Sequence, residues 1–305
     1  MKKQKKRYSR LAKKMMQRKL NKIAKDTNLF LKSFIAKQKK SNLIVAMKYG
    51  LFSGGKKIRS KILIDVGSIF KLDYKTLIII GAAVECIHAY SLIHDDLPCM
   101  DDDSIRRGKP SAHIKFGEAT AVLAGNSLLT LAFEIISDKK NLLTLKQKNE
   151  IITLLSNCAG HTGIAGGQEL DLKFENKKKS FNQIIDMQRK KTGKLFNFCL
   201  QSAAIVANKS KKEKLAYGEI GEDIGLLFQL SDDFLDLKGL KKLVGKPIKK
   251  DRKKGKSTLI SLMGYEKTLR YANNLKKKIL LKLKKHGKVT KDLIETIEFI
   301  QRRNF

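Results

Sequence analysis

Proline is scarce in this sequence, with three residues in a chain of 305. Proline breaks the interior of helices, so its scarcity leaves room for many uninterrupted ones. We expect the three prolines, Pro98, Pro110 and Pro247, to lie in loops. Sustained alternation of apolar and polar residues, which is typical of strands, is also missing. Both absences favour an all-α fold.

Cysteine and long apolar runs are scarce as well. The four cysteines are widely spaced and form no CxxC pair: Cys86, Cys99, Cys158 and Cys199. This pattern argues against a disulfide scaffold or a zinc knuckle and favours reduced thiols in a cytoplasm. The best apolar run, residues 77–84, stops at Glu85 and His88, whereas a membrane-spanning helix needs about 20 residues. We therefore expect a cytoplasmic protein without a membrane span, and no signal-peptide core follows the start.

Acidic residues are few: 29 Asp and Glu stand against 65 Lys and Arg, for a formal charge of +36. Hydrophobic residues make up 42% of the chain, which excludes wholesale disorder. A basic excess attracts polyanions, but only 11 of the 65 basic residues are Arg, the usual reader of base edges. The lysines are spread along the whole chain. They predict solvated helix faces rather than a nucleic-acid site.

The chain reads as one domain of long helices. Residues rich in Leu, Ala, Ile and Lys, which suit helices, occupy 73–97, 111–137, 180–207 and 211–237. Residues 1–25 hold 12 basic residues and no acid, which predicts a basic N-terminal helix or arm. A transit peptide is disfavoured there because such peptides prefer Arg and Ser. No repeat and no Gly-, Ser- or Pro-rich linker divides the chain, so residues 1–305 are predicted to form a single domain.

Two acidic clusters stand out in this acid-poor chain. The first places five Asp within residues 95–103, directly after an apolar helical run. The second consists of Asp232, Asp233 and Asp236, of which the first and last share a helix face. Like charges this close raise one another's pKa unless a cation neutralises them. Clusters of carboxylates suit Mg²⁺, which is commonly shared with substrate phosphates. A merely solvated acidic loop is the alternative.

Four short basic segments could bind phosphate groups. Arg binds phosphate as a bidentate fork and Lys as a point charge. The segments are Gly54-Gly55-Lys56-Lys57-Ile58-Arg59, Arg106-Arg107-Gly108, Lys191-Thr192-Gly193 and Gly255-Lys256-Ser257-Thr258. Each segment alone is weak evidence for a phosphate site, because the chain contains 65 basic residues. The first lacks P-loop spacing, which disfavours a nucleotide kinase.

Taken together, these segments resemble the trans-polyprenyl diphosphate synthases, most closely the bacterial farnesyl diphosphate synthases. The resemblance runs from about Gly54 to the C-terminal Gln301-Arg302-Arg303. It is carried by residues 84–94, by residues 106–110 and by the second acidic cluster. The four-residue gap before Asp101 matches the longer bacterial form of the first motif, and residues 166–172 match a further family segment.

The resemblance implies an isoprenoid synthase fold: an all-α, single-domain bundle of about ten or more helices around a deep central cavity that the two aspartate motifs face. It implies a homodimer and a site with several Mg²⁺ ions, for which Mn²⁺ is an alternative. The implied activity is a prenyltransferase that condenses isopentenyl diphosphate with dimethylallyl and geranyl diphosphate to give farnesyl diphosphate.

The resemblance also implies roles for single residues. Direct metal ligands would be Asp95, Asp101 and Asp232, with Asp96, Asp233 and Asp236 as ligands or their supports. Isopentenyl diphosphate would be held by Lys56, Arg59, His88 and Arg107. The allylic diphosphate would be held by Arg106, Lys191, Lys246 and Lys256. Thr192 and Gln229 would offer oxygen dipoles to the carbocation. Tyr90, five residues before Asp95, would be the floor that stops the growing product.

The sequence departs from the family pattern in three places: Ser60 stands where proline is usual, Ser231 stands where glutamine is common, and residues 237–245 are altered and rich in Lys. One alternative is a geranylgeranyl diphosphate synthase of the same family. A terpene cyclase would not need the second diphosphate pocket that Lys56, Arg59 and Arg107 supply. A nucleic-acid-binding protein would leave both acidic clusters unexplained, because carboxylates repel phosphates in the absence of metal.

Overall fold

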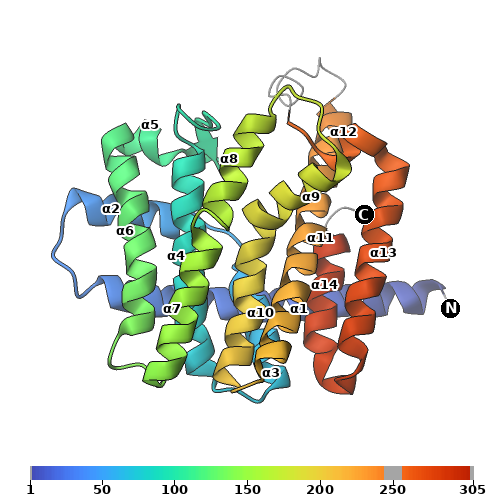
Figure 1. Ribbon diagram of the computed structural model, residues 1–305, viewed down its shortest axis with the longest axis horizontal. Helices are drawn as coiled ribbons and strands as arrows, with labels where there is room; N and C mark the ends of the chain where they lie inside the picture. Colours follow the sequence, from blue (N-terminus) through green and yellow to red (C-terminus); the bar gives the residue numbers. More distant parts are fainter. Residues whose placement is uncertain (1, 244–255, 303–305) are drawn as a thin grey trace. The chain divides into compact units, whose positions relative to one another are not determined.

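The computed structural model describes the backbone of residues 2–243 and 256–302, and within these the side chains of residues 14–237 and 256–301. Helices dominate the described part of the chain (Figure 1). Their bounds are α1 Lys2–Ile35, α2 Asn42–Leu51, α3 Ile58–Ile69, α4 Tyr74–Asp95, α5 Ala112–Phe116, α6 Glu118–Ser137, α7 Leu145–Ala159, α8 Ile164–Phe174, α9 Phe181–Gln188, α10 Lys194–Val206, α11 Lys211–Leu243, α12 Leu259–Met263, α13 Tyr265–Lys284 and α14 Lys291–Arg302. A π-helix, η1, spans Arg189–Gly193, and a 3₁₀ turn, η3, spans Gly287–Thr290. The all-α prediction is confirmed.

The predicted helices are present, and two of the predicted segments are interrupted. The segment predicted at 73–97 is α4, which Asp73 begins by accepting a hydrogen bond from the Thr76 amide at 2.8 Å. The segment at 111–137 is split into α5 and α6 by Gly117, whose φ of 83° is incompatible with a continuous helix. The segment at 180–207 contains η1, and the one at 211–237 continues to Leu243. The basic N-terminus is helical, within α1.

A short antiparallel hairpin follows the first acidic cluster. Its strands are β1 (Ile105–Arg106) and β2 (Lys109–Pro110), with Ile105 opposite Pro110. The expectation that Pro110 lies in a loop is therefore wrong, because a short edge strand tolerates a residue without an N–H. Pro98 lies in the turn after α4, as expected. Pro247 lies outside the described residues.

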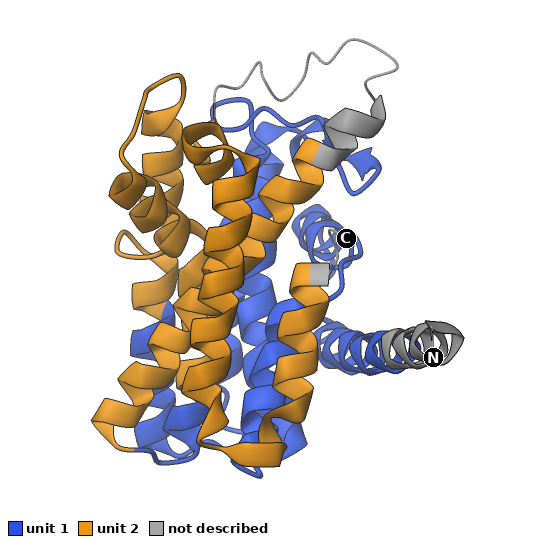
Figure 2. Cartoon of the chain, turned by 90° about the vertical axis from the view of Figure 1, so that its right-hand side faces the viewer, with its two compact units in different colours: residues 1–155, 202–209 blue, residues 156–201, 210–305 orange. Residues whose placement is uncertain are grey.

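The chain divides into two compact units, residues 1–155 with 202–209 and residues 156–201 with 210–305 (Figure 2). In the first unit α4 packs against α1, α2, α3 and α6. Its side chains Ile80, Val84 and Ile87 are fully buried. This central helix carries the first acidic cluster at its C-terminal end.

The second unit is built around η1, which packs against α8, α9 and α11. Glycines permit these close approaches. A Cβ on Gly167 of α8 would lie 2.1 Å from the backbone nitrogen of Lys191, and one on Gly225 of α11 would lie 2.6 Å from the Cα of Gly193. Real Cβ atoms do not come so near, so glycine is required at both positions. They place the basic η1 segment directly between α8 and α11.

By length and composition, α4 and α6 could each cross a membrane. Neither helix is an unbroken apolar run, so this result differs from the expectation of no membrane span. Of the most apolar window in each helix, 72% is buried within the protein for α4 and 44% for α6. The apolar surface of α4 is thus largely used in packing inside the protein, as in a core helix.

Candidate active site

The first acidic cluster is shaped by a tight loop at the end of α4. Asp95 is the last residue of the helix and Asp96 its C-cap. The chain then turns back, because the amide of Asp101 donates to the Asp95 carbonyl at 2.8 Å and the amide of Asp103 donates to the Asp96 carbonyl at 3.2 Å. The four-residue gap in the motif therefore returns Asp101 to the helix end, beside Asp95.

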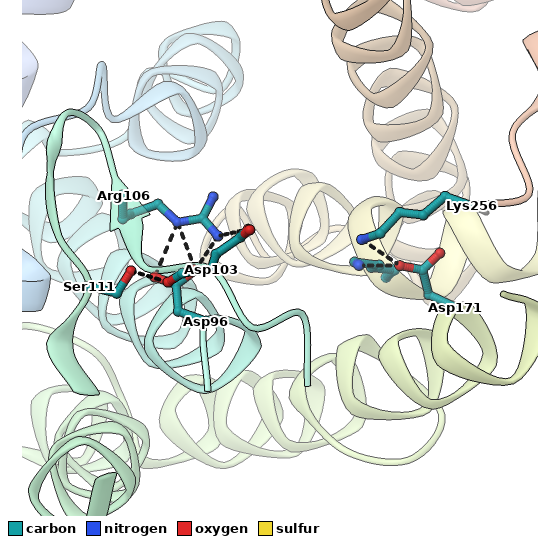
Figure 3. A network of polar contacts seen from close by, with 7 residues as sticks. Asp96, Asp103, Arg106, Ser111, Asp171 and Lys256 are labelled. Atoms are coloured by element: carbon teal, nitrogen blue, oxygen red, sulfur yellow. Dashed lines mark hydrogen bonds and ion pairs between the residues drawn. The ribbon is translucent and has the colours of Figure 1, made fainter. Parts of the chain in front are cut away.

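Within this cluster Asp96 is buried and held by Arg106 of β1 (Figure 3). The Arg106 Nε donates to both carboxylate oxygens of Asp96, at 2.9 and 3.2 Å, and a terminal nitrogen bonds Asp96 and lies 3.4 Å from Asp103. Burial alone would lower the pKa of Arg106, but these carboxylates raise it. Arg106, expected to hold a diphosphate, is thus paired with carboxylates, and Asp96 fits the supporting role.

Arg107 is positioned by a glycine-rich loop. It lies in the turn of the hairpin at a φ of 53°, and a terminal nitrogen donates to the Gly54 carbonyl at 2.6 Å and contacts the Ser53 hydroxyl at 3.3 Å. A Cβ on Gly55 would lie 2.9 Å from three atoms of the guanidinium. The predicted basic segments at 54–59 and 106–108 therefore meet, with the exposed Lys56 on the same loop.

His88 lies on α4, seven residues before Asp95, among cationic groups. Burial lowers its pKa well below the usual value, and Arg59, Arg107 and Lys57 lower it further. The ring is therefore neutral at pH 7, and its charge environment favours an anion. The structure thus places together three of the residues predicted to hold isopentenyl diphosphate, His88, Arg59 and Arg107.

Sequence reasoning missed a buried group beneath these cations. The Lys57 side chain is buried, donates to the Leu51 carbonyl at 3.2 Å and lies 3.6 Å from a Glu85 oxygen. The amide and hydroxyl of Ser60 donate to the other Glu85 oxygen at 3.3 and 3.1 Å. Proline would supply neither donor, so the departure from the family pattern at Ser60 was the signal that a buried acceptor lies nearby.

The second acidic cluster lies on α11 in the other unit. Asp233 accepts hydrogen bonds from the amide groups of Gln229 at 2.9 Å and Gln188 at 3.2 Å. Burial raises the pKa of Asp233 to about 7; the Gln229 bond opposes this rise, and Asp236 and Asp232 add to it. Asp232 and Asp236 thus disfavour a further negative charge on Asp233, and a cation added to this cluster would lower the free energy.

Thr192 and Gln229, expected to offer oxygen dipoles, contact each other. The Thr192 hydroxyl donates to the Gln229 carbonyl oxygen at 2.8 Å, while the Gln229 amide nitrogen donates to Asp233. A continuous chain therefore links η1 to the second acidic cluster. Gln188 also contacts Asp233, but no pattern in the sequence distinguishes it.

Lys191 and Lys256, expected to hold the allylic diphosphate, share one acceptor (Figure 3). This acceptor is the carboxylate of Asp171 on α8, within the segment 166–172 that matched the family without an assigned role. Lys246 lies outside the described residues, and the backbone of the altered segment 237–245 is described as far as Leu243, where α11 ends.

Tyr90 lies on α4, half buried and edge-on to His94, with ring centroids 5.4 Å apart. The His94 Nε2 lies 3.0 Å from the Val122 carbonyl oxygen, and the ring fits because Gly125 has no side chain. His94 is thus a packed residue. The role of Tyr90 in product length stays a prediction.

The donor set fits Mg²⁺ chemically. Within the described ranges, no three His, Cys, Asp or Glu side chains already form a metal-binding group. Each acidic cluster nevertheless consists of carboxylates, the hard oxygen ligands that Mg²⁺ prefers. The loop bond that returns Asp101 to Asp95 brings two such ligands together. The raised pKa of Asp233 marks a cluster that a cation would stabilise.

The chain is similar to several known proteins. The family model described as polyprenyl synthetase matches residues 40–297. The farnesyl diphosphate synthase of Escherichia coli K12 is 41% identical over 261 residues, which cover 84% of this chain and 87% of that protein. The crystal structure of an FPP/GFPP synthase from Zymomonas mobilis superposes with a TM-score of 0.84 at 33% identity, covering 93% of this chain and 98% of that one. A geranyltransferase from Helicobacter pylori, complexed with magnesium and isoprenyl diphosphate, superposes with a TM-score of 0.77 at 30% identity, over 93% of this chain and 97% of that one.

Proposed function

The chain belongs to the polyprenyl synthetase family, and we propose that it is a prenyltransferase that condenses isopentenyl diphosphate with dimethylallyl and then geranyl diphosphate to give farnesyl diphosphate. One observation carries the proposal: each acidic cluster is accompanied by its own group of cations. Arg59 and Arg107 lower the pKa of His88 in the unit of the first cluster. Lys191 and Lys256 converge on Asp171 in the unit of the second.

The isopentenyl diphosphate is held by the first group of cations. Arg59 and Arg107 neutralise its charge, and Lys56 adds a third cation from the exposed loop. His88 is neutral at working pH, so it contributes a hydrogen bond rather than a charge. An imidazole with a lowered pKa keeps this role across the neutral range.

The allylic diphosphate is held by Lys191 and Lys256, with Lys246 assigned by family resemblance alone. These lysines stabilise the negative charge that develops on the departing group. The bond between the allylic carbon and the diphosphate oxygen breaks, and its electron pair leaves with the diphosphate. The double bond of isopentenyl diphosphate then attacks the allylic cation, and a proton is lost to the released pyrophosphate. Water must be kept from the cation throughout.

We assign the metal to the carboxylates, with Asp95, Asp101 and Asp232 as direct ligands and Asp96, Asp233 and Asp236 as ligands or supports. Several Mg²⁺ ions per site, for which Mn²⁺ could substitute, would neutralise the diphosphate and make it a better leaving group. The fit rests on the hard oxygen donors and on the raised pKa of Asp233.

We further propose one catalytic domain over residues 1–305, a cytoplasmic location and a homodimer. Support for the homodimer comes from α6, where Val122 and Leu123 are 37% and 54% exposed. Sedimentation of the purified protein tests it. A monomer at all concentrations would contradict it.

The activity is tested by incubating the protein with isopentenyl and dimethylallyl diphosphates and Mg²⁺ and sizing the products by chromatography. We expect mainly farnesyl diphosphate. Mainly geranylgeranyl diphosphate would identify the longer-chain member of the family. Hydrocarbon products made without isopentenyl diphosphate would identify a terpene cyclase.

A further inference from the structure

Asp171 has no role in the reaction as proposed, yet it is the acceptor that two substrate-binding lysines share (Figure 3). Its Oδ2 lies 2.6 Å from the Nζ of Lys191 and 3.4 Å from the Nζ of Lys256. The carboxylate side chain is 8% exposed, whereas the two lysine side chains are 24% and 33% exposed. The lysines therefore remain open to a ligand while the aspartate lies behind them.

The charges of the three side chains favour a position of the Asp171 carboxylate between the two lysine ammonium groups. Burial alone would raise the pKa of Asp171, but Lys191 and Lys256 outweigh it, and the pKa is lowered. The carboxylate therefore stays ionised at neutral pH. Two ammonium groups held close to each other repel, and a carboxylate between them removes much of this repulsion. Without it, each flexible lysine side chain would move away from its neighbour.

Contacts other than those of Asp171 hold both lysine segments against α8 and the turn that follows it. Gly167 brings the Lys191 backbone against the helix, as described above. The Ser257 hydroxyl lies 3.0 Å from the Phe174 carbonyl and 2.9 Å from the Lys177 carbonyl, which fixes the residue next to Lys256. Loss of the Asp171 charge should therefore free the two side chains while the backbone of the two lysine segments remains in place.

We propose that Asp171 is a positioning residue that holds the ammonium groups of Lys191 and Lys256 side by side for the allylic diphosphate. This inference rests on the proposed function, which gives those two lysines their ligand. Asp171 acts through the lysines and does not touch the substrate. The unliganded site is thereby ordered before the diphosphate arrives, so less conformational freedom is lost on binding.

The experiment compares Asp171→Asn with Glu169→Gln. Glu169 lies two residues earlier on the same helix, is 54% exposed and pairs with Lys173, so its variant removes an equal charge from α8 without touching the two substrate lysines. We expect Asp171→Asn to raise the KM for geranyl diphosphate by about tenfold, the loss that accompanies one charge-assisted contact. The KM for isopentenyl diphosphate should stay within about twofold, since its cations lie on other elements. Asp171→Glu, which keeps the charge, should restore part of the loss.

Inorganic pyrophosphate binding, measured by calorimetry with Mg²⁺ present, should weaken in Asp171→Asn and remain unchanged in Glu169→Gln. Circular dichroism and thermal unfolding show whether each variant is folded, and Asp171→Glu tests the inference if Asp171→Asn is not. Equal rises in both KM values, or no rise, would overturn it. So would a higher Mg²⁺ requirement with unchanged KM values, which would make Asp171 a metal ligand. Lys191→Ala and Lys256→Ala distinguish a failure of the Asp171 inference from a failure of the proposed lysine site. A normal KM for geranyl diphosphate in both variants would refute the lysine site itself.

Discussion

Replacing Gly55 by alanine should weaken the binding of isopentenyl diphosphate although Gly55 carries no charge. The new Cβ would lie 2.9 Å from the Cζ and both terminal nitrogens of Arg107, so the guanidinium must move. It would then lose its 2.6 Å hydrogen bond to the Gly54 carbonyl. A hydrogen bond from a charged group contributes about 1.5–3 kcal/mol, and each 1.4 kcal/mol is about a tenfold change. The KM for isopentenyl diphosphate should rise by about 10- to 150-fold.

The neighbouring glycine provides a matched control. Gly54 has a φ of +106° and Gly55 a φ of +100°, so alanine strains the backbone similarly at either position. A Cβ on Gly54, however, meets nothing within 4 Å. Gly54→Ala should therefore carry the strain without displacing Arg107. Steady-state rates with isopentenyl diphosphate varied at saturating geranyl diphosphate measure the difference. Equal KM values in the two variants would refute the positioning of Arg107 by this loop.

Much of the fold could be predicted because helices depend on nearby residues. The segments 73–97 and 211–237 are rich in apolar residues and contain no proline, which predicted α4 and α11. The capping residue Asp73 begins α4 within one residue of the predicted start. The breaks were harder to foresee. Gly117 ends a helix through a positive φ, which glycine permits but does not require. The π-helix at 189–193 packs against α8 and α11, and residue periodicity does not reveal such a break.

In the candidate site, likewise, features formed by neighbouring residues could be predicted, whereas contacts between distant residues could not. The aspartates of residues 95–103 are neighbours in the sequence, so their clustering could be predicted. The partners that hold the predicted residues come from distant segments. Asp171 lies 20 positions from Lys191 and 85 from Lys256. Glu85 lies 25 positions from Ser60. Only the tertiary fold brings such pairs together, so candidate ligand-binding residues could be named from the sequence, whereas the residues that hold them in place could not.

Three further changes test other parts of the site and its surroundings. Asp95→Ala or Asp232→Ala, or chelation of Mg²⁺ in the native enzyme, should reduce turnover by orders of magnitude while circular dichroism stays helical; normal turnover would contradict the metal assignment. Gln168 is 6% exposed, and neither polar atom of its side chain has a hydrogen-bond partner in the described part of the chain. An unsatisfied buried polar group costs about 1–3 kcal/mol, so Gln168→Met should raise the free energy of unfolding in urea by about 1 kcal/mol; a decrease would mean that the amide has a partner. Tyr90 lies about 7.5 Å from Asp95 along the rise of α4 and is large and half buried against His94, so it can block a growing chain. Tyr90→Ala should lengthen the product to geranylgeranyl diphosphate or beyond on chromatography, and an active variant that still stops at farnesyl diphosphate would place the floor at another residue.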